Sequence, residues 1–260
     1  MVVAPGTGWP GDFADRRTPI AVTRADVVRL AAAAPSMDQL DAVVSMCRAC
    51  VRLVEWREEV AAKRRASFAT ETYWGRPITG WGPADAHIAV VGLAPAAHGG
   101  NRTGRVFTGD RSGDWLFRAL HRAGLAKLAT SVRADDGQEL LDVRMLAAVR
   151  CAPPANKPTP GERDTCRPWL ERELILLRPT LQVVVALGGF AWTTLWPALA
   201  AVGYDVPACR PSFGHLAEAG TADGLAVLGS YHPSQQNTFT GRLTEPMLDA
   251  VFARAREIVG

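Results

Sequence analysis

Four short apolar runs, separated by segments of helical character, constrain the fold of this chain more than any other feature. They lie at residues 87–93, 143–149, 181–187 and 225–230. Within each run the apolar residues are nearly continuous and do not alternate with polar ones. Such continuity is typical of parallel strands that are covered on both faces. Strands that alternate with helices predict a mainly parallel sheet sandwiched between helices.

Helical patterns fill the segments between these runs and most of the N-terminal region. Residues 37–65 carry a helically spaced apolar face, and Ser36 or Asp38 is suited to cap its start. The clearest start signal is the segment 159–162, which fits a capping box with a proline at the first helical position. The expected helices cover residues 23–34, 37–65, 112–123, 160–178, 189–200 and 244–258.

The chain has 260 residues, enough for a well-buried core. The glycine and proline content predicts a flexible N-terminal arm over residues 1–20, followed by a single domain over residues 21–260. The arm lacks the apolar stretch of a signal peptide, and no run approaches the roughly 18 residues of a membrane span. We therefore expect a cytoplasmic protein with no membrane partner.

The loops that follow the first, second and fourth apolar runs hold the least ordinary residues of the sequence. They cover residues 92–110, 151–159 and 231–241. In open α/β sheets, ligands bind beyond the carboxyl ends of the strands. Because those ends share one edge of a parallel sheet, we expect the three loops to converge on one active site.

Three side chains in these loops are suited to a flat polar ring. Phe107 offers a stacking face, Asn156 can donate and accept hydrogen bonds in one plane, and His232 can stabilise charge. An enzyme that acts on a base of a DNA duplex must extrude it, stack it and read its edge. Taken singly, these residues also fit a core aromatic, a turn residue and a structural loop histidine. Their joint occurrence at strand ends favours the functional interpretation.

The same loops closely resemble motifs of the uracil-DNA glycosylase superfamily, specifically its iron–sulfur-containing fifth class. The resemblance rests on GLAPAAHGGNRTGRVFTGDRSGDWL, CAPPANKPTP and YHPSQQNTFTGRLT and extends over about residues 40–258. It implies a three-layer α/β sandwich with a central four-stranded parallel sheet flanked by helices. It also implies a DNA repair enzyme that hydrolyses the N-glycosidic bond of uracil and other deaminated bases, including those in double-stranded DNA.

The resemblance implies roles for single residues as well. Phe107 is similar to the aromatic that stacks on the flipped base, and Asn156 to the side chain that reads the base edge. His232 is similar to the group that stabilises the departing base or the developing sugar cation. The loop after the fourth run resembles the one that fills the gap left in the duplex, with Phe239 or Gln236 as its wedge. The residues expected to contact DNA are Ser234, Gln235, Gln236, Phe239 and Arg242.

The first loop departs from most of the superfamily, in which an acid or amide just after the strand positions the attacking water. Leu93 and Ala94 stand there instead. The nearest carboxylate is Asp110, which we expect to orient the water or stabilise the cationic sugar. Asp110 is also suited to cap the following helix. Ala96 replaces a bulkier residue that excludes the thymine methyl group in stricter classes, so hypoxanthine, hydroxymethyluracil and ethenocytosine are expected substrates.

Four of the five cysteines form two pairs. Cys47 and Cys50 make a C-x-x-C motif on a predicted helix, and Cys151 and Cys166 supply a wider pair. Four thiolates from two distant segments can bind either zinc or a [4Fe–4S] cluster, and their spacing does not separate the two. The resemblance implies a structural [4Fe–4S] cluster, which would tie the N-terminal helix to the loop that carries Asn156.

Two other function classes stay open on sequence grounds. A nucleic-acid-binding relative without catalysis would account for the missing acids in the first loop. A hydrolase of free nucleotides could use the same strand-end loops but would have no use for a wedge segment. The formal net charge of +3 is compatible with DNA but does not require it. A monomer suits a small repair enzyme.

Overall fold

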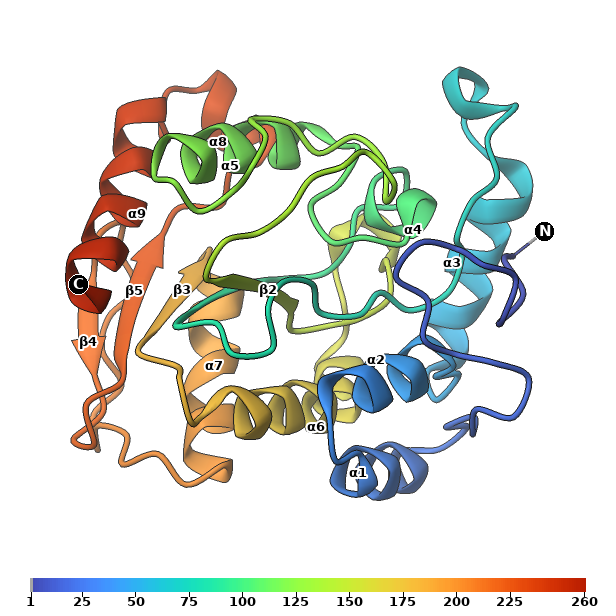
Figure 1. The fold of residues 1–260 in the computed structure, drawn as a ribbon, viewed down its shortest axis with the longest axis horizontal. Helices are drawn as coiled ribbons and strands as arrows, with labels where there is room; N and C mark the ends of the chain where they lie inside the picture. The colour runs from blue at the N-terminus through green and yellow to red at the C-terminus, as the bar shows by residue number, and fades with distance from the viewer. Residues whose placement is uncertain (1) are drawn as a thin grey trace.

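Four parallel strands form the centre of the molecule, as the apolar runs predict. The computed structural model describes residues 2–260, and its sheet has the strand order β2-β1-β3-β5-β4 (Figure 1). The parallel strands are β1 (Ile88–Gly92), β2 (Val143–Ala147), β3 (Val183–Leu187) and β5 (Ala226–Ser230). β1 pairs with both β2 and β3, and β3 pairs with β5.

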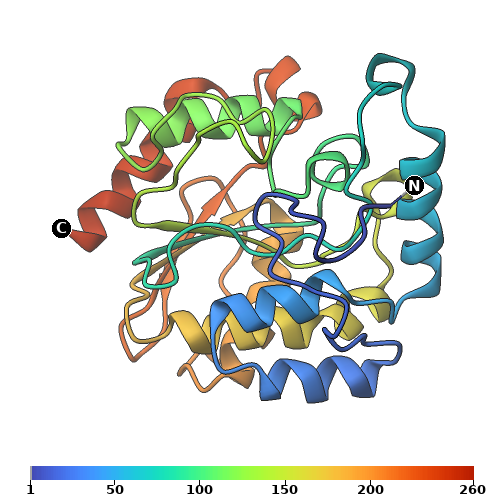
Figure 2. The ribbon, with the colours of Figure 1, turned by 45° about the vertical axis from the view of Figure 1, so that its right-hand side comes forward.

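Helices cover both faces of this sheet and make it the middle layer of three. Alternate residues of β1 face opposite layers: Val90 packs with the core around α5 and α9, whereas Val91 packs with the core around α6 and α7. Figure 2 shows α5 and α9 on one side of the sheet and α1, α2 and α6 on the other. The larger helices are α1 (Arg24–Ala33), α2 (Met37–Ser45), α3 (Val51–Lys63), α5 (Arg111–Arg122), α6 (Pro160–Leu177), α7 (Gly189–Ala201) and α9 (Glu245–Val259).

Several short elements were not expected from the sequence. The fifth strand, β4 (Glu218–Gly220), pairs antiparallel with β5 at the edge of the sheet. Its three residues carry no apolar run, because an edge strand with exposed side chains needs none. The other short elements are the helices α4 (Gly100–Thr103) and α8 (Gln235–Phe239) and the 3₁₀ turns η1 (Ala66–Phe68) and η2 (Pro154–Asn156).

The prediction of a single helix over residues 37–65 is wrong, because the helical backbone is interrupted between α2 and α3. The N–H of Arg48 leaves the helical pattern and donates to the carbonyl of Ala21 at 2.7 Å. Cys50 then has an extended backbone and serves as the N-cap of α3. The C-x-x-C motif therefore lies in a turn between two helices and not on a helix.

Residues 2–20, for which the sequence predicts a flexible arm, make specific contacts with the rest of the chain. The indole N–H of Trp9 donates to the carbonyl of Thr103 at 3.1 Å, and its ring lies 5.9 Å from that of Trp74. Asp12 accepts two hydrogen bonds from the buried guanidinium of Arg76, at 2.7 and 3.1 Å. Met1 lies outside the described residues. No helix within residues 2–260 is long and apolar enough to span a membrane.

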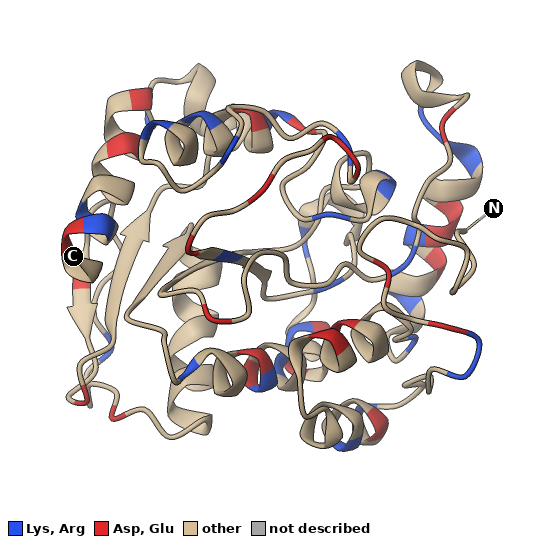
Figure 3. Cartoon of the chain, in the orientation of Figure 1, with Lys and Arg blue, Asp and Glu red and all other residues tan. Residues whose placement is uncertain are grey.

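A buried network of four charged side chains joins α2, β2 and α6. Arg144 of β2 donates to Asp41 of α2 at 2.9 Å and to Glu173 of α6 at 2.6 Å. Glu173 also pairs with Arg150, which follows β2. Burial raises the pKa of Asp41 in spite of the Arg144 charge. Burial also opposes ionisation of Glu173, but the two guanidinium groups outweigh it and lower its pKa. Figure 3 shows the charges of α2 and α6 side by side below the sheet.

Removing Arg144 is expected to destabilise the fold strongly, because Asp41 would remain buried without a partner. We expect Arg144→Met to lower the free energy of unfolding by ~3–5 kcal/mol, measured by chemical denaturation. Arg254→Met is the matched control, since Arg254 pairs with Glu218 on the exposed surface. Its cost should be ~1 kcal/mol or less. Equal costs for the two variants would contradict a structural role for the buried network.

Candidate active site

The loops after β1, β2, β3 and β5 lie together at the carboxyl edge of the sheet. Beyond the strands, the N–H groups of Ala148 and Val149 donate to the carbonyls of Gly92 and Leu93, each at 2.9 Å. These bonds hold the β2 loop against the β1 loop. Further along the same edge of the sheet, the N–H of Gly188, directly after β3, donates to the carbonyl of Ser230 at the end of β5, at 2.8 Å. The convergence expected from the sequence is thus present.

Phe107 lies across the end of β1 and is almost fully buried. A Cβ atom on Gly92 would come within 2.5 Å of the Phe107 ring, so glycine is needed at this strand end. A Cβ atom on Gly113 would come within 2.1 Å of the Phe107 carbonyl oxygen. The Phe107 backbone has a φ of +52°, which is uncommon for a bulky residue and indicates a conformation imposed by its surroundings. Its ring centroid lies 6.1 Å from that of His232, so the structure brings these two predicted residues together.

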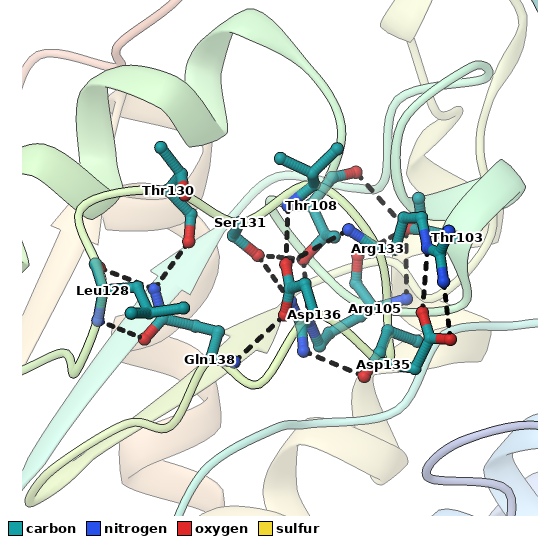
Figure 4. A network of polar contacts seen from close by, with 12 residues as sticks. Thr103, Arg105, Thr108, Leu128, Thr130, Ser131, Arg133, Asp135, Asp136 and Gln138 are labelled. Atoms are coloured by element: carbon teal, nitrogen blue, oxygen red, sulfur yellow. Dashed lines mark hydrogen bonds and ion pairs between the residues drawn. The ribbon is translucent and has the colours of Figure 1, made fainter.

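A polar network holds the loop that carries Phe107 (Figure 4). The guanidinium of Arg105 donates to Thr108 Oγ1 at 3.0 Å, to Ser131 Oγ at 2.8 Å and to Asp136 at 2.6 Å. The N–H of Gly109 donates to the carbonyl of Ser131 at 2.8 Å. Asp136 and Ser131 come from the long connection between α5 and β2. These residues are not predictable from the sequence, because no local motif links the two segments.

His232 lies in an environment that keeps its imidazole neutral. Burial lowers the pKa of His232 to about 4. Its carbonyl accepts hydrogen bonds from the N–H of Ser234 and from the side-chain amide of Asn237, both at 2.8 Å, which fixes the turn after β5. Within residues 2–260, neither imidazole nitrogen has a hydrogen-bond partner. The ring is therefore free to donate to or accept from a bound molecule.

An open pocket of about 290 Å³ lies beside His232. It combines apolar and aromatic side chains with the polar groups Asn237 and Arg242. The guanidinium of Arg242 lies 4.6 Å from the centroid of the Tyr231 ring. The helix α7 begins at this pocket, and Gly188, its N-cap, offers no side-chain cap to its first N–H groups. The remaining lining residues are Leu93, Leu187, Gly188, Gly189, Phe190, Phe213 and Tyr231.

Asn156 lies in the turn η2, where two consecutive residues have left-handed backbones. The φ angles of Ala155 and Asn156 are +52° and +55°. Asparagine tolerates this conformation, but alanine adopts it rarely, so the turn is held by its surroundings. The side chain of Asn156 is exposed and has no hydrogen-bond partner among residues 2–260. The lining of the pocket beside His232 includes neither Asn156 nor Ala96, whose carbonyl accepts from the N–H groups at the start of α4.

Asp110 caps α5, as one of its two sequence interpretations predicts. One carboxylate oxygen accepts a hydrogen bond from the N–H of Gly113 at 3.0 Å. The other oxygen lies against Gly99, where a Cβ atom would come within 2.2 Å of it. Burial raises the pKa of Asp110, in opposition to the hydrogen bonds from the helix start. Capping thus occupies one oxygen and leaves the second beside the first loop.

The segment expected to enter DNA folds as the short helix α8 and its flanks. Phe239 is its most exposed apolar side chain, with 70% of its surface accessible. The guanidinium of Arg111 lies 5.3 Å from the Phe239 ring centroid. Gln235 and Gln236 are exposed as well, and Ser234 is the N-cap residue, although its side chain makes no cap hydrogen bond.

The four paired cysteines surround one small cavity of about 20 Å³ beneath the active-site loops. Cys47 and Cys50 come from the break between α2 and α3, Cys151 from the β2 loop and Cys166 from α6. Burial raises the pKa of Cys50 to about 12, and repulsion from the neighbouring cysteines adds to this effect. Within residues 2–260, no three histidine, cysteine or acidic side chains form a group that could hold a single metal ion.

Buried hydrogen-bond donors without acceptors stand around the same cavity. In the described part of the chain, four such donors lack a hydrogen-bond acceptor. They are Arg57 Nε, Arg150 Nε, a terminal nitrogen of Arg150 and the indole N–H of Trp169. Arg150 and Trp169 line the cavity. Unpaired buried donors are costly, and so many around one cavity indicate a group with several acceptor atoms. The sulfur atoms of a cluster would provide them.

Comparison with known proteins agrees with this geometry. Residues 79–256 match the family described as the uracil DNA glycosylase superfamily. The chain belongs to this superfamily. It is 53% identical to the type-5 uracil-DNA glycosylase of Mycobacterium bovis over 99% of this chain and 95% of that protein. Identity to the type-5 uracil-DNA glycosylase of Thermus thermophilus is 49%, over 84% of this chain and 95% of that one. The protein of the same name from Pyrobaculum aerophilum is 46% identical over 82% and 89%. The resemblance to the fifth class is confirmed.

The neutral state of His232 can be tested by NMR titration of its imidazole. The pKa is about 4 in the folded chain and roughly 6.5 in an unfolded one. Between these values the unfolded state binds more protons, so the stability that depends on this neutral ring is lost as the pH falls from about 6.5 towards 4. We expect no titration of the folded imidazole above pH ~5. The urea-unfolded protein is the control and should titrate near 6.5. A folded-state midpoint near that value would contradict the buried, neutral ring.

Proposed function

We propose that this superfamily member hydrolyses the N-glycosidic bond of uracil in DNA and leaves an abasic site. The observation that carries the proposal is the close approach of the Phe107 and His232 rings at the carboxyl edge of the sheet, with centroids 6.1 Å apart and planes tilted by 39°, made possible by Gly92. Its relatives of 46–53% identity are named type-5 uracil-DNA glycosylases. We also propose that the protein acts as a monomer, which suits a small repair enzyme.

In the proposed mechanism, the flipped base stacks on Phe107 and Asn156 reads its hydrogen-bonding edge. Asn156 is suited to this role because its side chain is free and its backbone is held in a specific turn. His232, neutral at physiological pH, donates a hydrogen bond to the base as negative charge develops on it. A preorganised donor in a site shielded from water stabilises such charge far better than water does. The glycosidic bond breaks and the base leaves with the bonding electrons. Water then adds to the sugar carbon and releases a proton, which neutralises the departed base anion.

Asp110 has a double role in this proposal. One oxygen caps α5 and fixes the carboxylate, and the second orients the attacking water or stabilises the cationic sugar. The two roles are compatible because a carboxylate can accept several hydrogen bonds. Leu93 and Ala94 contribute no acid, so electrostatic stabilisation carries most of the barrier reduction. The small side chain of Ala96 supports a broader range of bases, including hypoxanthine, hydroxymethyluracil and ethenocytosine.

DNA is held in this proposal by α8 and its flanks. The exposed ring of Phe239 enters the duplex and fills the gap left by the flipped base, a role for which Gln236 is the alternative. Arg242 and the uncapped start of α7 face the same pocket and suit a backbone phosphate. Ser234 and Gln235 supply further polar contacts to the backbone.

We propose that Cys47, Cys50, Cys151 and Cys166 bind a [4Fe–4S] cluster. One observation supports this choice over zinc. The unpaired buried donors around the cavity suit the many sulfur atoms of a cluster better than a single ion that brings no acceptor atoms. When bound, the cluster supplies structural cross-linking and no chemistry on the base.

A catalytically inactive DNA-binding relative is the second candidate function. The observation in its favour is that the first loop lacks an acid and that Asp110 is engaged as a helix cap. A duplex with one U·G pair separates the two candidates. Alkali cleaves the strand at an abasic site, so cleavage at the uracil establishes glycosylase activity. Tight binding to abasic DNA without any cleavage would establish the inactive relative.

The role of Asn156 predicts a large loss of activity on substitution. Asn156→Ala should lower kcat/KM on the U·G duplex by about 10²–10³-fold, because a preorganised hydrogen-bonding partner of the base is lost. Gln182→Ala is the control, since Gln182 is exposed at the opposite edge of the sheet. Circular dichroism should show both variants folded. Activity of Asn156→Ala equal to that of the control would exclude the base-reading role.

The wedge can be identified by comparing single- and double-stranded substrates. Phe239→Ala should lower kcat/KM on duplex DNA by about tenfold or more and affect single-stranded DNA much less, since only the duplex requires unstacking. Gln236→Ala, one turn earlier on the same short helix, should change both substrates little. If Gln236→Ala instead shows the duplex-specific loss, Gln236 is the wedge and the Phe239 assignment is wrong.

A further inference from the structure

Among residues 2–260, no carboxylate makes a hydrogen bond to the buried guanidinium of Arg57. It lies on α3 and is 1% exposed. Its nearest acidic group is Glu58, at 3.9 Å, which is partly exposed and already paired with Arg48. Arg150, the other buried guanidinium beside the cysteines, differs because it pairs directly with a buried carboxylate. A buried charge is strongly unfavourable unless it is paired, so Arg57 requires another negative partner.

The two hydrogen bonds of the Arg57 side chain both end at the cysteine cavity. One terminal nitrogen donates to the Sγ atom of Cys151 at 2.9 Å, and the other donates to the carbonyl of Cys47 at 3.1 Å. A neutral thiol is only a weak acceptor, whereas a thiolate is a full negative charge. The contact therefore suits a Cys151 that is deprotonated and bound to a metal group.

Arg57 also contacts the first active-site loop through its main chain. The carbonyl oxygen of Arg57 accepts a hydrogen bond from the side-chain amide of Asn101 at 3.2 Å. Asn101 is a buried residue of α4, within the loop that carries Phe107. One residue of α3 thus touches the β2 loop, the break before α3 and the β1 loop.

We propose that Arg57 is the counter-charge of the cysteine-bound cluster. The inference rests on the proposed [4Fe–4S] cluster and assigns to this residue a role beyond the four ligands. A fixed positive charge and an N–H donor at a ligand sulfur stabilise the more negative, reduced state of a cluster. The guanidinium accordingly sets the reduction potential and slows the loss of iron, and it acts as a positioning residue with no contact to the base.

The test compares Arg57→Gln with Lys63→Gln in protein purified with its metal. Lys63 is exposed on the last turn of the same helix. Its substitution by glutamine removes the same charge from α3 at a site that does not contact a cysteine. We would measure three quantities for each protein: its iron and sulfide content, its rate of iron release to a chelator, and its one-electron reduction potential with dithionite as reductant. For Arg57→Gln we expect about tenfold faster iron release and a tenfold shift towards the oxidised cluster, ~59 mV in potential. Lys63→Gln should match the wild type.

Arg57→Lys covers the case in which Arg57→Gln does not fold. It keeps the charge but can contact only one of the two acceptors, so it should release iron faster than the wild type and have a potential lower than the wild type by less than ~59 mV. A loaded Arg57→Gln, or failing that a loaded Arg57→Lys, with unchanged potential and iron release would overturn the role of Arg57. Wild-type protein that holds zinc or no metal would instead overturn the cluster itself.

Discussion

The parallel pairing of β1 with both β2 and β3 is the constraint on which the rest of the structure depends. Parallel strands direct all their carboxyl ends to one edge, so the loops after them must meet there whatever their sequence. The strands are short and buried on both faces, and they hold these ends in fixed positions. Gly92 then allows the Phe107 ring to cross the end of β1. The proposed base-stacking surface is thus built at the end of a fully buried strand that is paired on both sides.

Two sets of contacts, one polar and one around the cysteines, support the loops at the carboxyl edge of the sheet. On one side, Arg105 ties the β1 loop to the connection before β2 through hydrogen bonds and an ion pair with Asp136. On the other side, the cysteine cavity joins α6 and the break before α3 to the β2 loop. Arg57 links the two sides, because its side chain reaches Cys151 and its carbonyl accepts from Asn101. The loops can therefore carry strained residues, whose cost is offset by these contacts.

The electrostatics of the site fit the departure of an anionic base better than the activation of water by a strong base. Burial keeps the imidazole of His232 neutral, so it can donate a hydrogen bond to the base without placing a positive charge in the site. One oxygen of Asp110 is occupied as a helix cap, which limits this carboxylate as a base. In the proposed mechanism, a site of this kind lowers the barrier by stabilising charge that develops during bond cleavage. This agrees with the absence of an acid at Leu93 and Ala94.

The sequence by itself determined the parallel sheet, its covering helices, the strand-end loops and the superfamily, because continuous apolar runs and contiguous motifs are local properties. Tertiary structure alone decided features that depend on residues far apart. The C-x-x-C motif lies in a helix break because Arg48 bonds to Ala21. β4 forms because β5 offers it a free edge. No local pattern encodes the contact between Arg57 and Cys151, which arises only when α3 packs beside the β2 loop.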